Sequence, residues 1–199
     1  MMRVVALVLA AGEGRRMGGP NKLLAEIGGV SLVRRVALAA LESRASEVMV
    51  VVGHRQAAIR SALAGLLLSF VQNNDYAAGL STSLRTGVAA LGANADGVLV
   101  MLADMPFVNR EIIDRVVEAF AASDRQGIVA PVHGGRRGNP VLWPRHFFAA
   151  LMAIEGDKGA RDIMAAHAAD VIEVEAGPAV ALDIDTAQAL AEAGGRIRS

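Results

Sequence analysis

The feature that most constrains this fold is the stretch 4–24, an apolar run followed at once by a loop rich in glycine and basic residues. Residues 4–9 have the length and β-branched composition of a buried strand. Glycine lets the backbone approach a ligand closely, and cationic side chains bind phosphate. We therefore predict a polyphosphate-binding loop after the first strand, formed by Gly12, Gly14, Arg15, Arg16, Gly18, Gly19 and Lys22.

Two standard phosphate-binding motifs do not fit this loop. The Rossmann pattern G-x-G-x-x-G would need a third glycine at the position of Met17, and the P-loop would need Gly-Lys-Ser/Thr where the chain has Asn21, Lys22 and Leu23. The loop is therefore expected to bind charge with its own side chains, and a dinucleotide-binding oxidoreductase is disfavoured.

The string LAAGEGRRMGGPNKLL resembles the signature of the MobA-like nucleotidyltransferases, L-A-A/G-G-x-S/G-x-R-M-G-x-x-N/D-K. Ala11, and Asn21 before Lys22, resemble the molybdenum cofactor cytidylyltransferase branch, because the guanylyltransferase branch usually reads L-A-G-G and Asp-Lys. The alternative is an ordinary glycine-rich surface loop, although many spaced positions match at once. The resemblance extends from Val4 to about Leu190. It implies an α/β, three-layer α/β/α Rossmann-like nucleotidyltransferase fold with a mostly parallel central sheet.

Length and composition agree with one such domain over residues 1–199. Apolar residues make up 53% of the chain, but no uninterrupted apolar run reaches the roughly 20 residues that span a bilayer. The chain has no cysteine and a formal net charge of zero. We therefore expect a cytoplasmic protein without disulfides, with neither a membrane nor a nucleic acid as its partner.

The rest of the chain alternates between predicted strands and predicted helices. After the first strand, strands are predicted at 47–53, 67–72, 97–102, 127–131 and 170–174. Helices are predicted at 31–43 and 56–63, and others begin at Ser81 or Ser83, at Asn109, at Pro144, before Ile163 and at Thr186, with a frayed end after the last. This alternation predicts a mostly parallel sheet.

A second segment, NNDYAAGLSTSLRTG at 73–87, resembles the nucleobase segment of the cytidylyltransferases, G-L/M-x-S/T-S-L-x-x-G. The alternative is that Ser81 or Ser83 only caps a helix. Where guanylyltransferases tend to have Pro-Leu, this chain has Ser83 and Leu84. Taken together, the two resemblances imply these nucleotide-binding residues: Leu9, Ala10, Ala11, Gly12, Gly14, Arg16, Lys22, Gly79, Ser81, Ser83 and Gly87.

Asp104 follows the predicted strand 97–102 and is the first candidate metal ligand. A carboxylate at the carboxyl end of a central parallel strand lies where open α/β sheets bind ligands. The family has a metal-binding aspartate in Gly-Asp-Met-Pro, and here Ala103 replaces the glycine. The resemblance implies a Mg²⁺ ligand, and the alternative is a turn aspartate before the next helix.

The segment LDIDT at 182–186 offers two further carboxylates. We expect Asp183 and Asp185 to point to opposite faces if the segment is extended, so that at most one reaches the cleft. Resemblance to aspartates near the carboxyl terminus of related transferases favours Asp185 as the metal ligand, with Asp183 in reserve. In the alternative, Thr186 caps the last helix and Asp185 assists it.

Two polar stretches resemble acceptor-binding strings of the family. The R-G-N-P string implies that Gly138, Asn139 and Pro140 lie beside the acceptor, whereas a solvated hairpin is the alternative. The G-D-x-G-A-R pattern implies that Asp157, Lys158 and Arg161 bind the acceptor, with Lys158 and Arg161 at its phosphate. A charged helix start is the alternative for that pattern.

These expectations combine into one reaction, whose substrates come from the resemblance. CMP would pass from CTP to the phosphate of molybdopterin or molybdenum cofactor, with Mg²⁺ on Asp104 and Asp185 and release of pyrophosphate. Arg16 would hold the β- and γ-phosphates, and Lys22 would lie at the α-phosphate. A recipient molybdoenzyme is a further partner that this reaction implies. The alternatives are a transferase that uses GTP or a sugar or polyol phosphate, and a non-catalytic molybdenum cofactor carrier.

Overall fold

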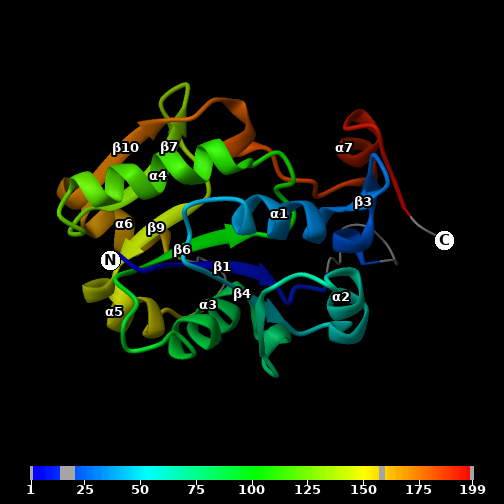
Figure 1. The fold of residues 1–199 in the computed structure, drawn as a ribbon, viewed down its shortest axis with the longest axis horizontal. Helices are drawn as coiled ribbons and strands as arrows, with labels where there is room; N and C mark the ends of the chain where they lie inside the picture. Colours follow the sequence, from blue (N-terminus) through cyan, green and yellow to red (C-terminus); the bar gives the residue numbers. More distant parts are fainter. Residues whose placement is uncertain (1, 14–20, 157–159, 198–199) are drawn as a thin grey trace.

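The computed structural model of the chain describes residues 2–13, 21–156 and 160–197. Within these residues a central sheet is covered by helices on both faces (Figure 1), which confirms the predicted three-layer α/β/α fold. Seven residues with predicted ligand-binding roles lie outside the described residues: Gly14, Arg15, Arg16, Gly18, Gly19, Asp157 and Lys158.

The central sheet has eight strands in the order β10-β7-β9-β6-β1-β4-β5, with β8 paired to β7. At its centre β1 (Val4–Ala10) is parallel to β4 (Glu47–Val52) and to β6 (Gly97–Leu102), and every residue of β1 is buried. The others are β5 (Ser69–Gln72), β7 (Ile128–His133), β8 (Arg136–Arg137), β9 (Val141–Pro144) and β10 (Val171–Glu175). The parallel centre explains the unbroken apolar runs in the sequence.

β9 departs from the predicted parallel order, because it runs antiparallel to both β6 and β7. Pro144, which was predicted to begin a helix, is instead the last residue of this strand. The 3-10 helix η4 (Arg145–Phe147) follows and leads into α5 (Phe148–Met152). The strand was missed because a four-residue apolar run that ends in proline carries no recognisable period.

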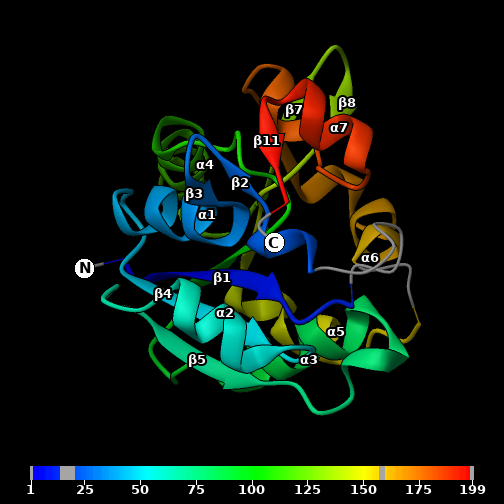
Figure 2. The same cartoon turned by 90° about the vertical axis from the view of Figure 1, so that its right-hand side faces the viewer.

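Helices cover the sheet according to their apolar faces. One core cluster takes in α1 (Leu32–Leu41), α2 (Gln56–Ala62) and α4 (Arg110–Ala122). The other takes in α3 (Leu80–Ala89), α5 and α6 (Arg161–Ala166). Figure 2 shows α1 and α4 on one side of β1, and α3 and α5 on the other. No helix in the described part of the chain is long and apolar enough to cross a membrane.

Helix starts show where sequence signals hold and where they fail. Asn109 caps α4 by accepting a hydrogen bond from the backbone N–H of Ile112, at 3.0 Å, as predicted. The predicted cap at Ser81 or Ser83 is wrong, because α3 begins one turn earlier after Gly79. Gly79 has a φ of 111°, which favours glycine, and both serines are thereby placed inside the helix.

A second, three-stranded sheet lies beside the main one in the order β11-β2-β3. It consists of β2 (Glu26–Ile27), β3 (Val30–Ser31) and β11 (Gly195–Arg196), and β11 follows α7 (Ala187–Glu192). The frayed end predicted after the last helix is therefore wrong at β11, which pairs antiparallel with β2. Strands of two residues have no periodicity, so the sequence pattern could not reveal them.

Candidate active site

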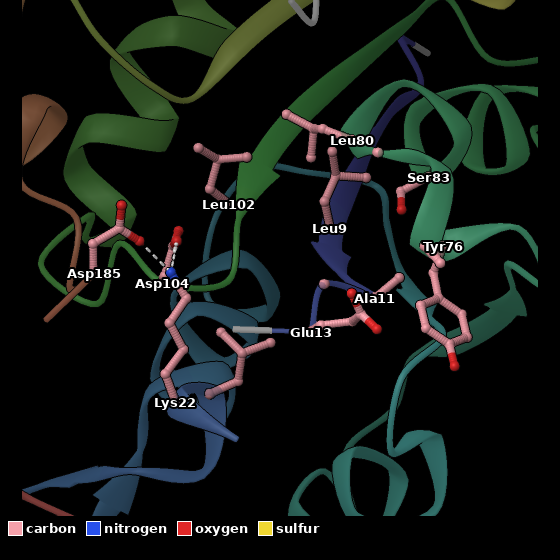
Figure 3. Close-up of a pocket in the computed structure, with 14 residues that line it drawn as sticks. Leu9, Ala11, Glu13, Lys22, Tyr76, Leu80, Ser83, Leu102, Asp104 and Asp185 are labelled. Atoms are coloured by element: carbon pink, nitrogen blue, oxygen red, sulfur yellow. Dashed lines mark hydrogen bonds and ion pairs between the residues drawn. The ribbon is translucent and has the colours of Figure 1, made fainter. Parts of the chain in front are cut away.

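The carboxyl ends of β1 and β6 border a pocket of about 380 Å³, a size that suits a small-molecule ligand. Leu9 lies opposite Leu102 in the sheet register, so the loop after β1 and the turn at Asp104 leave the sheet side by side. The pocket changes character along its length (Figure 3). Its charged end holds Lys22, Asp104 and Asp185; its middle holds Leu9, Ala11 and Glu13; its far end holds Tyr76, Leu80 and Ser83. Gly12 and Gly79 also line the pocket.

Lys22 joins two carboxylates at the charged end of the pocket. Its Nζ donates to Asp104 Oδ2 at 2.6 Å and also to Asp185 Oδ1. Lys22 begins the 3-10 helix η2 (Lys22–Leu24), whose cap is the buried Asn21: its Oδ1 accepts a hydrogen bond from the backbone N–H of Leu23 at 3.0 Å. This cap fixes the backbone from which the lysine reaches the carboxylates.

Asp183 also belongs to this cluster. One carboxylate oxygen from each of Asp104, Asp183 and Asp185 lies within 4.8 Å of the others. Of the last two, only Asp185 lines the pocket, as predicted, but the reason given for that prediction does not hold. Residues two apart in an extended chain share a face, so the premise of opposite faces was mistaken. Ile184, between Asp183 and Asp185 in the sequence, is buried and donates its backbone N–H to the Asp104 carbonyl oxygen at 2.9 Å. This bond holds the segment 183–185 against the Asp104 turn.

The electrostatics of the cluster follow from its charge excess. Burial raises the pKa of the Asp183 carboxyl, and the nearby carboxylates of Asp185 and Asp104 raise it further. Burial by itself lowers the pKa of the Lys22 ammonium, but Asp104 and Asp185 more than offset this, so its pKa lies above its ordinary value. Three carboxylates outnumber one ammonium, and oxygen ligands suit a hard divalent cation. The donor set therefore fits a metal such as Mg²⁺ or Mn²⁺.

The far end of the pocket contains residues that the sequence analysis missed. Tyr76 and Leu80 line it together with the predicted Gly79 and Ser83. A Cβ placed on Gly53 would lie 2.8 Å from the Tyr76 Cβ, so glycine there permits the close approach of this wall to β4. Tyr76 is the only tyrosine of the chain and lies in the segment 73–87, three residues before the glycine that begins the nucleobase pattern, and this position was the available signal.

Among the residues that the structure describes, three of the predicted nucleotide-binding residues do not line this pocket: Ala10, Ser81 and Gly87. Ala10 and Ser81 are buried. At Gly87 an added Cβ would lie 2.5 Å from the Leu7 side chain, so this glycine lets α3 pack closely against β1. For these three residues the structure shows packing, and a nucleotide contact stays a prediction.

The predicted acceptor string also has a structural role. The Gly138 N–H donates to the Pro131 carbonyl oxygen at 2.8 Å, and the Asn139 N–H donates to the Val180 carbonyl oxygen at 2.9 Å. A Cβ on Gly138 would lie only 2.0 Å from that Val180 oxygen. The string therefore holds the 3-10 helix η6 (Pro178–Ala181), from which the chain runs directly to Asp183. Pro140 is buried and Arg161 is exposed, and their contact with an acceptor stays a prediction.

The chain is similar in sequence to two groups of known proteins. The chain is 36% identical over 125 residues to the bifunctional protein GlmU of Anaeromyxobacter sp. (strain Fw109-5), a match that covers 60% of this chain and only 26% of that protein. It is 29% identical over 142 residues to the molybdenum cofactor guanylyltransferase of Shewanella sp. (strain ANA-3), which covers 71% of this chain and 68% of that protein. This chain thus spans about a quarter of GlmU and about two thirds of the guanylyltransferase.

The fold has a close counterpart among solved structures. Rv0371C of Mycobacterium tuberculosis H37Rv, solved in complex with manganese, matches with a TM-score of 0.82 at 24% identity, over 96% of this chain and 98% of that one. The sequence family described as the MobA-like NTP transferase domain matches residues 6–171. This match takes in β1, the Asp104 turn and most of the sheet, and the chain therefore belongs to the MobA-like NTP transferase family.

Proposed function

We propose that residues 1–199 form one transferase domain that moves CMP from CTP to the phosphate of molybdopterin or molybdenum cofactor and releases pyrophosphate in the cytoplasm. The observation that carries this proposal is the arrangement of Lys22 among Asp104, Asp183 and Asp185 at one end of the pocket. A cation and a group of potential metal ligands at one end, with less polar walls at the other, suit the two halves of a nucleoside triphosphate.

In this reaction the chain mainly positions charged groups. Lys22 binds the α-phosphate and stabilises the negative charge that grows there, and Arg16 binds the β- and γ-phosphates. The acceptor phosphate is already a nucleophile, so no side chain needs to act as a general base. A divalent cation held by Asp104, Asp183 and Asp185 would neutralise phosphate charge and make pyrophosphate a better leaving group.

The choice of CTP rests on Ala11, on Asn21 and on the Ser83-Leu84 pair, all three of which resemble the cytidylyltransferase branch. The second candidate is GTP, which the similarity to the Shewanella guanylyltransferase favours. Sugar phosphates belong among the acceptors that are tested, because the sequence leaves a transferase that acts on a sugar or polyol phosphate as an alternative.

The proposal is tested by pyrophosphate release from CTP, GTP, UTP and ATP, with Mg²⁺ or Mn²⁺, and with molybdopterin, a sugar 1-phosphate or no acceptor. We expect turnover only with CTP and the pterin, and its loss in Asp104→Asn. A preference for GTP contradicts the base assignment, and turnover with the sugar phosphate contradicts the acceptor. Cofactor binding without pyrophosphate release from any nucleotide would indicate a non-catalytic carrier.

A further inference from the structure

The Asn73 side chain, at the end of β5, is buried to 2% exposure and its hydrogen bonds fix its orientation. Its Oδ1 accepts the backbone N–H of Asp75 at 2.9 Å. Its Nδ2 donates to Thr82 Oγ1 at 2.8 Å and to Ser83 Oγ at 3.0 Å, both on α3. Because a backbone N–H can only donate, the oxygen of the amide must face Asp75. The two amide protons therefore point at the two hydroxyl oxygens.

The hydroxyls of Thr82 and Ser83 differ in whether their own protons have a hydrogen-bond acceptor. Thr82 Oγ1 donates to the carbonyl oxygens of Gly79, at 2.8 Å, and Asp75, at 3.1 Å. Ser83 Oγ accepts from Asn73, and within residues 2–13, 21–156 and 160–197 its proton meets no acceptor. A buried hydroxyl proton without a partner is unfavourable, so a ligand that supplies an acceptor gains affinity there.

Ser83 is also the hydroxyl that reaches the pocket. It lines the cavity, whereas Thr82 and Asn73 do not. Figure 3 shows Ser83 at the far end, near Tyr76 and away from Lys22 and the carboxylates. If the phosphates lie at the charged end, the nucleobase lies at this end.

We propose that Asn73 is a positioning residue that makes Ser83 a hydrogen-bond donor to the nucleobase, and that this donor selects cytosine over uracil. The inference rests on the proposed function, since it assumes a nucleotide with its base at the far end of the pocket. Cytosine presents an acceptor at N3, where uracil presents an N–H donor. With cytosine, the Ser83 proton is paired with N3. With uracil, the Ser83 oxygen would accept from both Asn73 and the uracil N3–H, and its own proton would have no acceptor among the described residues, so uracil binds less well.

The test is Asn73→Asp, which keeps the shape of the side chain and the oxygen that accepts the Asp75 N–H. It replaces the amide nitrogen, which donates, with a carboxylate oxygen, which accepts. The Ser83 hydroxyl then donates to residue 73 and turns a lone pair toward the pocket. We expect the ratio of CTP to UTP affinity, measured by calorimetry with Mg²⁺, to fall by about tenfold or more. Ser83→Ala should lower the same ratio without inverting it.

Thr82→Val is the matched control, because it removes the other bond to the same amide without altering the pocket wall. It should keep the wild-type ratio, and circular dichroism and thermal melting of each variant report folding separately from selectivity. An unchanged ratio in both Asn73→Asp and Ser83→Ala overturns the proposal. An equal shift in Thr82→Val does so too, because it would show a general loosening of α3.

Failure of the proposed function gives a different result. A wild-type protein that prefers GTP contradicts the assignment of CTP, and the variants are then compared with GTP against ATP, whose pairing edges carry opposite donor and acceptor patterns. In that pair, a change of ratio in Asn73→Asp and Ser83→Ala, but not in Thr82→Val, supports the positioning role of Asn73. An unchanged ratio in Asn73→Asp and Ser83→Ala overturns it.

Discussion

Lys22 Nζ lies 2.6 Å from Asp104 Oδ2, although the two residues are 82 positions apart in the chain. The contact forms because β1 and β6 are adjacent parallel strands whose following segments meet at one edge of the sheet. The ammonium thereby occupies carboxylate oxygens that a divalent cation would also use. Lys22 and the metal should therefore compete until a nucleotide offers phosphate oxygens to the lysine.

Replacing Lys22 with Met tests this competition. Lys22→Met keeps an unbranched stem but removes the charge, so Mn²⁺ should bind more tightly than to wild type when no nucleotide is present. Turnover should fall by about 10²-fold or more, with a smaller change in KM, because a preorganised donor to the transition state is lost. Electron paramagnetic resonance of free Mn²⁺ and steady-state kinetics give the two readouts. Lys22→Arg is the charge-preserving control, and unchanged kcat in Lys22→Met would exclude the lysine from the chemistry.

Asp183→Asn should affect stability in opposite directions with and without metal. Because the pKa of Asp183 is raised in the folded state, its ionisation is less favourable there than in the unfolded chain, and this lowers stability as pH rises above the ordinary aspartate value. In EDTA at neutral pH, Asp183→Asn should therefore melt at a higher temperature than wild type. With saturating Mn²⁺ the order should reverse, because a ligand is lost. A lower melting temperature in EDTA would contradict the proposed repulsion.

Alanine substitutions at Gly12 and Gly87 should distinguish a glycine needed for nucleotide binding from one needed for packing. Among the described residues, no atom lies within 4 Å of a Cβ added at Gly12, which faces the pocket. Gly12→Ala should therefore keep its melting temperature but weaken nucleotide binding, measured by calorimetry. Gly87→Ala forces a Cβ against Leu7, and overpacking of this kind costs about 1–3 kcal/mol, so its melting temperature should fall by a few degrees. Wild-type affinity in Gly12→Ala would show that the ligand does not approach this backbone.

The parts of this molecule that the sequence predicted are those with a local cause. The run 4–9 is apolar because β1 is buried on both faces. Asn109 caps α4 through a hydrogen bond to a residue only three positions further along the chain. Asp104 was placed correctly because the carboxyl end of a central strand is a known ligand position. Each of these inferences needs only neighbouring residues or a general rule of sheet topology.

The missed features depend on contacts between distant segments. Asp183 joins the carboxylate cluster because Ile184 is held against the Asp104 turn, and no local pattern encodes that contact. Likewise, β11 exists only because it pairs with β2 near the other end of the chain. The bonds that Asn73 makes with α3 also require the folded arrangement, since an asparagine after a strand reads simply as a turn residue.

Gly138→Ala should disturb the cluster of Asp104, Asp183 and Asp185, although Gly138 is not part of it. A Cβ there would meet the Val180 carbonyl oxygen at 2.0 Å, so η6 must shift, and the segment that carries Asp183 and Asp185 shifts with it. We expect a lower melting temperature and Mn²⁺ affinity weaker by about tenfold, because coordination depends on ligand geometry. Gly92→Ala is the control, since no described atom lies within 4 Å of its added Cβ. Wild-type Mn²⁺ affinity in a folded Gly138→Ala would contradict this coupling.

Asp96 directly precedes β6, at the end of that strand away from the pocket, and should contribute to the pH dependence of the free energy of unfolding. The backbone N–H of Arg3 donates to its carboxylate at 2.7 Å, and this bond, together with the Arg125 guanidinium, holds the pKa of Asp96 below its usual value. A lowered pKa contributes stability above the ordinary aspartate pKa, and this stability is lost as pH falls through the lowered value. Wild type should therefore unfold at higher urea than Asp96→Asn at neutral pH, and the gap should close in acid. A constant gap for Asp96→Asn across this pH range would refute the linkage.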